Sequence, residues 1–322
     1  MPRLVVADGA VLARVLDALP PSAREGLSAA AFATFEHAVQ KTAWATGHRR
    51  RFALMDGDVV LATAVRGQLE ARLDDRPVRI CAIGSLWADP ARAAESHAAA
   101  LLAALLDAGR EEGADLALVV ASDERSWTIP EGFEPMPTTA VEVRVIESTR
   151  YGAPMTLVRG GEDRDLAAVV AMGDVRARLS RFHLVRDADF VKFALTRRRL
   201  LAGLVPAGQR ALRFLIAEEG ITAAAYVVLT EAAGTWTIEE CGDRDAAGAR
   251  VGALLQATIA REPVEQRPVI RGWLPPAFAP PQLALEPSPA SPPALFARSL
   301  SAGLAPLDLT AEQVLYWRND LF

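Results

Sequence analysis

Cysteine and histidine are scarce in this chain of 322 residues, which holds two cysteines and four histidines. Two cysteines, one in each half and both in apolar, strand-like surroundings, argue against a disulfide framework and favour a reducing compartment. No two histidines have the spacing of metal ligands, and no cysteine stands near a histidine, so no zinc site is predicted. The few ligand-forming side chains therefore point away from a metal-dependent or disulfide-stapled protein.

Basic charge and long apolar runs are also lacking. The formal net charge is −5, which argues against nucleic acid as a partner, because phosphate binding needs a basic footprint. Two short basic clusters, at 48–51 and 197–199, are interpreted as solvated surface, with an anion contact as the alternative. The apolar run at 98–106 is too short to span a membrane, and residues 1–9 do not resemble a signal peptide. We expect a cytoplasmic protein with no membrane partner.

The length and a repeated order of elements predict two domains, because one core rarely serves a chain of this size. Hydrophobic periodicity and turn residues mark the same plan twice, with a period of about 140 residues. The first half reads as helices at 9–20, 28–46 and 97–112 and strands at 51–55, 59–68, 77–88, 115–121 and 139–147. The second half reads as helices at 163–178, 187–202 and 249–261 and strands at 213–218, 221–231, 235–241 and 268–273.

Each half contains a strand–loop–helix–strand crossover, which makes two of its strands parallel. The predicted fold class is α/β (α+β), with a mixed, mostly antiparallel twisted sheet flanked by helices in each domain. The segment 274–293 contains eight prolines and cannot form a regular helix or a central strand. An edge strand at 294–300 and a closing helix at 310–317 are expected after it, with Thr310 and Gln313 in capping-box spacing. The predicted domains are 1–150, 151–285 and a C-terminal arm at 286–322.

A cofactor-binding pattern is suggested by the stretch 78–134. Its strand ends near Pro90, and a loop at 93–98 leads into a helix with Leu101 and Leu102 in its first turns. A strand at 115–121 and the pair Gly132 and Phe133 follow. These elements resemble the core of the GCN5-related N-acetyltransferase (GNAT) superfamily, and the two halves together look like a tandem GNAT protein. The resemblance implies acetyl-CoA (coenzyme A) as cofactor.

The resemblance also implies which residues hold that cofactor. Backbone N–H groups at a helix N-terminus form an anion site for the pyrophosphate, and small residues let it approach. The preceding strand would offer its edge to the pantetheine amides. The chain departs from the family's Gln/Arg-x-x-Gly-x-Gly/Ala loop, and Glu95 brings a negative charge close to the phosphates. The implied cofactor-binding residues are Leu86, Trp87, Ala88, Ala93, Ala94, Glu95, Ser96, His97 and Ala98.

Two residues are the implied catalytic candidates, Thr128 and Phe322. The family's Phe-Tyr pair reads Trp127 and Thr128 here, and in many members that tyrosine protonates the departing thiolate of coenzyme A. Thr128 has a hydroxyl but not the acidity of a phenol. The chain is also distantly similar to the enhanced-intracellular-survival type acetyltransferases, in which the C-terminal carboxylate lies in the active site. Phe322 supplies that carboxylate here, unless its aromatic ring simply docks into an apolar groove.

The second half carries a looser version of the pattern, at 245–250 followed by Leu254 and Leu255, and is interpreted as a degenerate unit whose role is packing. Glu239 could deprotonate an incoming amine, but a salt bridge to Arg213 or Arg271 is favoured.

The predicted function is an acyl-CoA-dependent N-acyltransferase, with acetyl-CoA as donor and a small-molecule or protein amine as acceptor. The alternative is a non-catalytic pseudo-acetyltransferase that acts as a protein-interaction or ligand-binding module. The proline-rich arm and the apolar C-terminal helix make a homo-oligomer a further expectation.

Overall fold

The computed structural model describes residues 2–121, 127–138, 140–146, 157–274, 278–288, 294–304 and 307–320. These residues form two compact units, and neither unit is continuous in the sequence. Unit 1 contains the described residues of Met1–Pro137 and Pro293–Leu309, and unit 2 contains those of Thr138–Pro292 and Thr310–Asp320. The expected boundaries at 150 and 286 fall elsewhere, because the strand near 140 belongs to unit 2 and the strand near 296 belongs to unit 1.

The strands of unit 1 are mostly antiparallel. They follow the order β1-β2-β3-β4-β5-β15-β6, and along this order, within the described residues, only β4 and β5 run parallel. β15 was expected at an edge, but it lies between β5 and β6. The strands are β1 Arg3–Val6, β2 Arg49–Asp56, β3 Val59–Leu73, β4 Arg76–Ala88, β5 Leu116–Ala121, β6 Glu134–Pro135 and β15 Ala294–Ser299.

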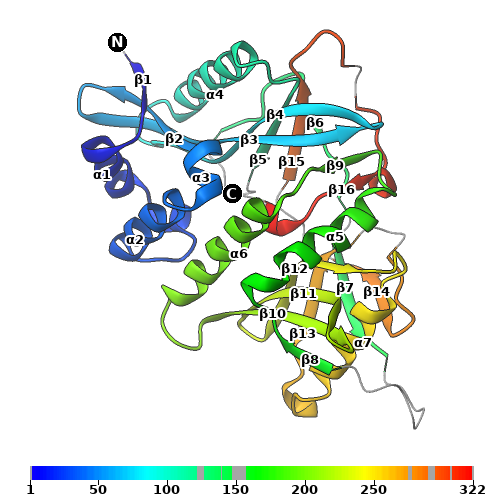
Figure 1. The fold of residues 1–322 in the computed structure, drawn as a ribbon. Coiled ribbons are helices and arrows are strands. Elements are labelled where there is room, and N and C mark those ends of the chain that lie inside the picture. The colour runs from blue at the N-terminus through cyan, green and yellow to red at the C-terminus, as the bar shows by residue number, and fades with distance from the viewer. Residues whose placement is uncertain are drawn as a thin grey trace. The chain divides into compact units, whose positions relative to one another are not determined.

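The helices of unit 1 are α1 Gly9–Ala18, α2 Ala29–Gln40, α3 Ala43–His48 and α4 Ala94–Glu111, with a 3₁₀ turn η1 at Pro21–Arg24. The single helix predicted at 28–46 is wrong, because the chain breaks at Thr42. The Thr42 hydroxyl donates to the Val39 carbonyl at 2.8 Å, a local bond that competes with helix continuation. α4 packs on β3 and β4 (Figure 1). A Cβ at Gly109 would lie 2.8 Å from that of Cys81, so α4 approaches β4 closely.

The sheet of unit 2 is also mostly antiparallel, and its strand order is β14-β7-β13-β12-β11-β10-β8. Along this order, β12 and β13 are the only parallel pair that the described residues form. The proline-rich segment contributes β14 at the edge of this sheet, where a missing N–H donor is tolerated. The strands are β7 Ala140–Val145, β8 Leu157–Gly160, β10 Arg210–Glu219, β11 Thr222–Ala232, β12 Thr235–Asp243, β13 Val269–Trp273 and β14 Leu283–Pro287.

The remaining elements of unit 2 are α5 Leu166–Ala177, α6 Ala188–Gly203 and α7 Ala249–Ile259, with short strands β9 Phe182–Leu184 and β16 Val314–Leu315 and the 3₁₀ turns η2 Asp163–Asp165, η3 Val264–Gln266, η4 Ala311–Gln313 and η5 Arg318–Asp320. The closing helix predicted at 310–317 is wrong. The expected capping box of Thr310 and Gln313 is present, but only one turn follows it. The four residues from Val314 to Trp317 are all buried, which an extended strand permits and a one-sided helix does not.

The predicted fold class is confirmed, since both units combine a mostly antiparallel sheet with flanking helices. Within the described residues, no helix has both the length and the apolarity needed to cross a membrane.

Candidate functional site

The parallel strands of unit 1 separate before they end. β4 and β5 are paired from Ile80 opposite Leu116 to Ile83 opposite Val119. β4 then continues along β3 to Ala88, after a bulge at which Ser85 has a φ of 49°. Bulges increase local twist and turn a strand away from its neighbour. Among the described residues, the edge of β4 beyond Ile83 therefore has no strand partner on the β5 side, and this edge contains the predicted Leu86, Trp87 and Ala88.

The helix that follows this edge begins without a side-chain cap. Its N-cap residue is Ala93, in the left-handed conformation with φ 45° and ψ 50°. The first turn of a helix has N–H groups with no partner inside the helix, and these carry a partial positive charge. The helix was expected to begin near His97 but begins at Ala94, because Ala93 already supplies the turn. Of the predicted residues, Ala93, Glu95 and Ser96 are exposed, Ala94 and His97 are half-buried, and Ala98 is buried.

Two of the predicted site residues contact each other. The hydroxyl of Thr128 donates to a carboxylate oxygen of Glu95 in the first turn of α4. Trp127, beside it, is 6% exposed and packs in the same core cluster as Leu101 and Leu102. The buried Trp127 ring therefore fixes the backbone that carries Thr128 to the N-terminus of α4, while the Glu95 charge is held by a neighbouring donor. Phe322, the other catalytic candidate, lies outside the described residues.

A residue that the sequence analysis did not select is Arg92. Its Nε lies 3.2 Å from a carboxylate oxygen of Asp89, and its side chain is half-exposed. The Asp89 carboxylate also accepts a hydrogen bond from the backbone N–H of Ala91 at 3.0 Å. The Asp89 side chain therefore stabilises the turn between β4 and α4. The sequence contained a signal for Arg92, because it directly precedes Ala93, which stands at the family's Gln/Arg position.

Unit 2 contains the same arrangement of strand, bulge and helix. β12 and β13 are paired only from Thr235 to Ile238, and β12 continues to Asp243 past an irregularity in its register with β11. α7 then begins at Ala249, after Gly248 in the left-handed conformation with φ 74°. Ala249 follows Asp243 by six residues, just as Ala94 follows Ala88 by six. Asp243 therefore occupies the position of Ala88.

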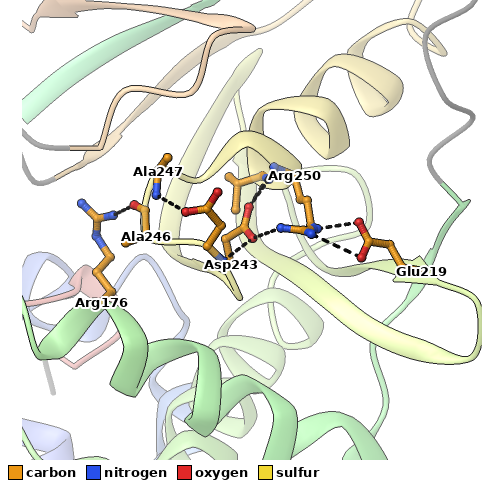
Figure 2. Close-up of polar contacts among 8 residues, drawn as sticks. Arg176, Glu219, Asp243, Ala246, Ala247 and Arg250 are labelled. Atoms are coloured by element: carbon orange, nitrogen blue, oxygen red, sulfur yellow. Dashed lines mark hydrogen bonds and ion pairs between the residues drawn. The ribbon is translucent and has the colours of Figure 1, made fainter.

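The helix N-terminus of unit 2 is filled by the chain's own carboxylate (Figure 2). One oxygen of Asp243 accepts from the backbone N–H groups of Arg250 at 2.8 Å and Val251 at 3.3 Å. The other accepts from the N–H of Asp245 at 2.9 Å and from the Arg250 guanidinium at 3.2 Å. The Asp243 side chain is 1% exposed. A buried carboxylate thus holds the place that a phosphate would take at a helix N-terminus.

Aromatic and charged groups cover the rest of that loop. A Cβ at Gly248 would overlap the ring of Phe278, and the Arg176 guanidinium stacks on the same ring at 4.6 Å. Arg176 also donates to the Ala246 carbonyl at 3.1 Å (Figure 2). A salt bridge of Glu239 is present, but its partners are Arg198 at 2.8 Å and Arg318 at 3.5 Å, and not the expected Arg213 or Arg271. The loop at 245–250, predicted as a degenerate unit, is therefore a packed turn that hydrogen-bonds with other residues of this chain.

The interpretation of the two basic clusters as solvated surface holds for His48, Arg50 and Arg199, which are exposed, and is wrong for the other arginines. Arg49 and Arg51 face inward from β2 and share the carboxylate of Glu36, at 2.9 Å and 3.2 Å, with all three side chains at most 2% exposed. Burial alone would raise the pKa of Glu36, but the two guanidinium charges outweigh it and lower that pKa to about 2. In the second cluster, Arg197 is buried and Arg198 is paired with Glu239.

No protein-family model matches this sequence, and no curated protein matches it either. Solved structures do match, over nearly the whole chain. A GCN5-related N-acetyltransferase from Anabaena variabilis ATCC 29413 has a TM-score of 0.65 and 10% identity over 94% of this chain and 73% of its own. A GCN5-related N-acetyltransferase from Kribbella flavida has a TM-score of 0.60 and 17% identity, over 93% and 71%. The Saccharomyces cerevisiae N-myristoyltransferase with bound myristoyl-CoA has a TM-score of 0.54 and 8% identity, over 92% and 82%. The chain has the fold of the GCN5-related N-acetyltransferases.

Proposed function

We propose that this chain is an acyl-CoA-dependent N-acyltransferase and that unit 1 holds the cofactor. The observation that carries the proposal is the unpaired edge of β4, which leads within six residues to an uncapped N-terminus of an 18-residue helix. A strand edge offers alternating N–H and C=O groups, and the uncapped first turn offers donors to an anion. The fold of the acetyltransferases that this chain resembles supports the same reading.

The residues present fit a cofactor of this class. Ser96 and Ala98 are small, so a phosphate can approach the backbone of α4, and the Glu95 charge is engaged by Thr128. Acetyl-CoA, when bound, supplies an acyl group already activated as a thioester. The backbone of Leu86, Trp87 and Ala88 would hold the pantetheine amides, and the first-turn N–H groups of α4 would hold the pyrophosphate. Arg92 stands beside that turn as a further cation.

One proton transfer is assigned to a residue of this chain. An attacking amine must lose a proton, which water can carry away. The departing thiolate must gain a proton, and the hydroxyl of Thr128 would donate it. The acceptor would be a small-molecule or protein amine.

A second candidate, a non-catalytic module that binds acyl-CoA or a protein partner, is favoured by one observation: the Thr128 hydroxyl already donates to Glu95 and lacks a phenol's acidity.

The test is a calorimetric or thermal-shift titration of the full chain with acetyl-CoA. A ligand at one hundred times its dissociation constant stabilises the folded state by about 2.7 kcal/mol, so the melting temperature of the wild type is expected to rise. Ser96→Glu places a carboxylate on the exposed first turn of α4 and should abolish the rise. Ala103→Glu makes the same change on an exposed residue two turns further along and should leave the rise intact.

The outcomes separate the candidates. A folded wild type that shows no shift at millimolar acetyl-CoA contradicts cofactor binding and with it the enzyme. Binding without release of free coenzyme A in the presence of a panel of amines favours the non-catalytic module.

A further inference from the structure

The last described residues of unit 2 insert polar groups into its interior. Val314 and Leu315 pair in parallel with Phe182 and His183 of β9. Trp317 then packs in the core of unit 2 with 2% of its surface exposed. Asn319 and Asp320 are just as deeply buried, at 1% and 2%. Residues 314–320, called here the C-terminal strap, are therefore held by packing and by buried polar contacts together.

Those polar contacts centre on one guanidinium between two carboxylates. Arg186 contacts Glu240 at 2.5 Å through Nη2 and Asp320 at 3.0 Å through Nε. The Asn319 amide donates to the same Glu240 oxygen at 2.7 Å. The backbone N–H of Trp317 donates to the second oxygen of Asp320 at 3.1 Å. Two buried negative charges thus share one positive charge, in a region where water screens little.

Buried acceptors of this cluster lack hydrogen-bond donors. Among the described residues, Oε1 of Glu240 and Oδ1 of Asn319 receive no hydrogen bond, and Oδ1 of Asp320 has only its ion pair with Nε of Arg186. Arg186, Trp317 and Asp320 line a cavity of about 20 Å³, which is enough for one water molecule. A proton on a carboxylate would supply the missing donor and remove the excess negative charge at once.

We propose that Asp320 binds a proton in mildly acidic solution and that this proton tightens the docking of the C-terminal strap onto unit 2. The direction follows from the balance of charges. Burial raises the pKa of Asp320, Arg186 opposes the rise and Glu240 adds to it, and the result is about 6 against an ordinary 3.8. Because the docked strap holds the proton more tightly than an undocked one, docking strengthens as the pH falls through 6.

Other titratable groups also surround the strap. Burial raises the pKa values of Tyr226 and Tyr316 well above 10, so both stay neutral. His183 is paired with Leu315, Asp174 lies on the cavity wall, Arg197 lies near Tyr316, and Glu239 forms ion pairs with Arg198 and Arg318. Asp320→Asn keeps all of these groups, so a pH response that they supplied would survive in that variant.

Hydrogen exchange tests the proposal in the full chain. Protection of the amides in the strap, corrected for intrinsic exchange, should rise about fourfold between pH 7.5 and pH 5.5. Asp320→Asn mimics the protonated side chain and should give the same protection at both pH values. Glu312→Gln removes an exposed carboxylate just before the strap and should keep the fourfold change.

A second variant keeps the test decisive if Asp320→Asn fails to fold. Glu240→Gln leaves Asp320 in place but removes the neighbouring negative charge, so the gain in protection at pH 5.5 should shrink. The proposal is overturned by a wild type whose strap protection is unchanged over this pH range. It is also overturned if Asp320→Asn keeps the fourfold change in strap protection. If Asp320→Asn does not fold, a fourfold change in Glu240→Gln overturns it.

Discussion

The two units solve the same local problem in opposite ways. In each unit, a strand separates from its parallel neighbour, and a helix begins six residues after the last residue of that strand. The N-cap residue of the helix has the left-handed backbone conformation. In unit 2 the last strand residue is Asp243, whose carboxylate fills the helix N-terminus. In unit 1 that residue is Ala88, which has no polar group to offer. One side chain at the end of a strand therefore decides whether the chain itself caps the helix N-terminus that follows.

The second helix residue completes the contrast. In unit 2 it is Arg250, which pairs with Asp243 at 3.2 Å and with Glu219 at 2.6 Å. In unit 1 it is Glu95, which accepts from Thr128. We call the turn at 243–250 in unit 2 the closed turn and the turn at 88–95 in unit 1 the open turn. The closed turn pairs an acid with a base, whereas the open turn carries a single acid with a neutral partner.

The largest effect is expected from breaking the closed turn. Asp243→Ala leaves the first N–H groups of α7 and the Arg250 guanidinium without their buried acceptor. Each buried donor left without its acceptor costs about 1–3 kcal/mol, and three backbone N–H groups lose theirs, so chemical denaturation should show a loss of about 3–5 kcal/mol. Asp245→Ala removes an exposed acid from the same loop. Its carboxylate accepts from the backbone N–H of Ala247, so the change should cost about 1 kcal/mol. Equal losses in the two variants would contradict the assignment of the cap to Asp243.

A somewhat smaller effect is expected from acid acting on unit 1. The pKa of Glu36 is lowered from 4.5 to about 2, so its stabilisation is complete above pH 4.5 and is lost as the pH falls toward 2. The shift corresponds to about 3 kcal/mol. The difference in unfolding free energy between the wild type and Glu36→Gln should therefore be large at pH 6 and shrink steadily below pH 4.5. A difference that does not vary with pH would refute the buried ion pair, and Glu70→Gln, an exposed control, should show none.

Acid therefore acts on the two units with opposite signs. The Glu36 contribution weakens at low pH because its pKa is lowered, whereas the Asp320 contribution strengthens because its pKa is raised.

The sequence predicted those parts of the fold that local patterns determine. The end of β4 near Ala88, the buried helix face with Leu101 and Leu102, and the capping box at Thr310 follow from periodicity and turn chemistry. The sequence could not show that β7 joins the sheet of unit 2 and β15 the sheet of unit 1. The alternation of apolar and polar residues predicts a strand but does not reveal which sheet it joins. Arg49 and Arg51 were missed because a run of charge suggests solvent, and only the fold brings Glu36 to them.

The candidate site divides in the same way. The small residues of its loop and the strand before it could be recognised from their spacing. The contact between Thr128 and Glu95 joins residues 33 positions apart, and the cap formed by Asp243 depends on where a strand stops. Neither has a local signature.

The most direct test transplants the closed turn into unit 1 and titrates acetyl-CoA by calorimetry. Ala88→Asp together with Glu95→Arg recreates the acid and the base of Asp243 and Arg250 around the start of α4. We expect the wild type to bind one acetyl-CoA per chain and the double variant, still folded, to bind at least tenfold more weakly. Glu95→Arg alone should not weaken binding. Two bound cofactors in the wild type, or unaltered affinity in the folded double variant, would contradict the claim that unit 1 alone offers an open helix N-terminus to the cofactor.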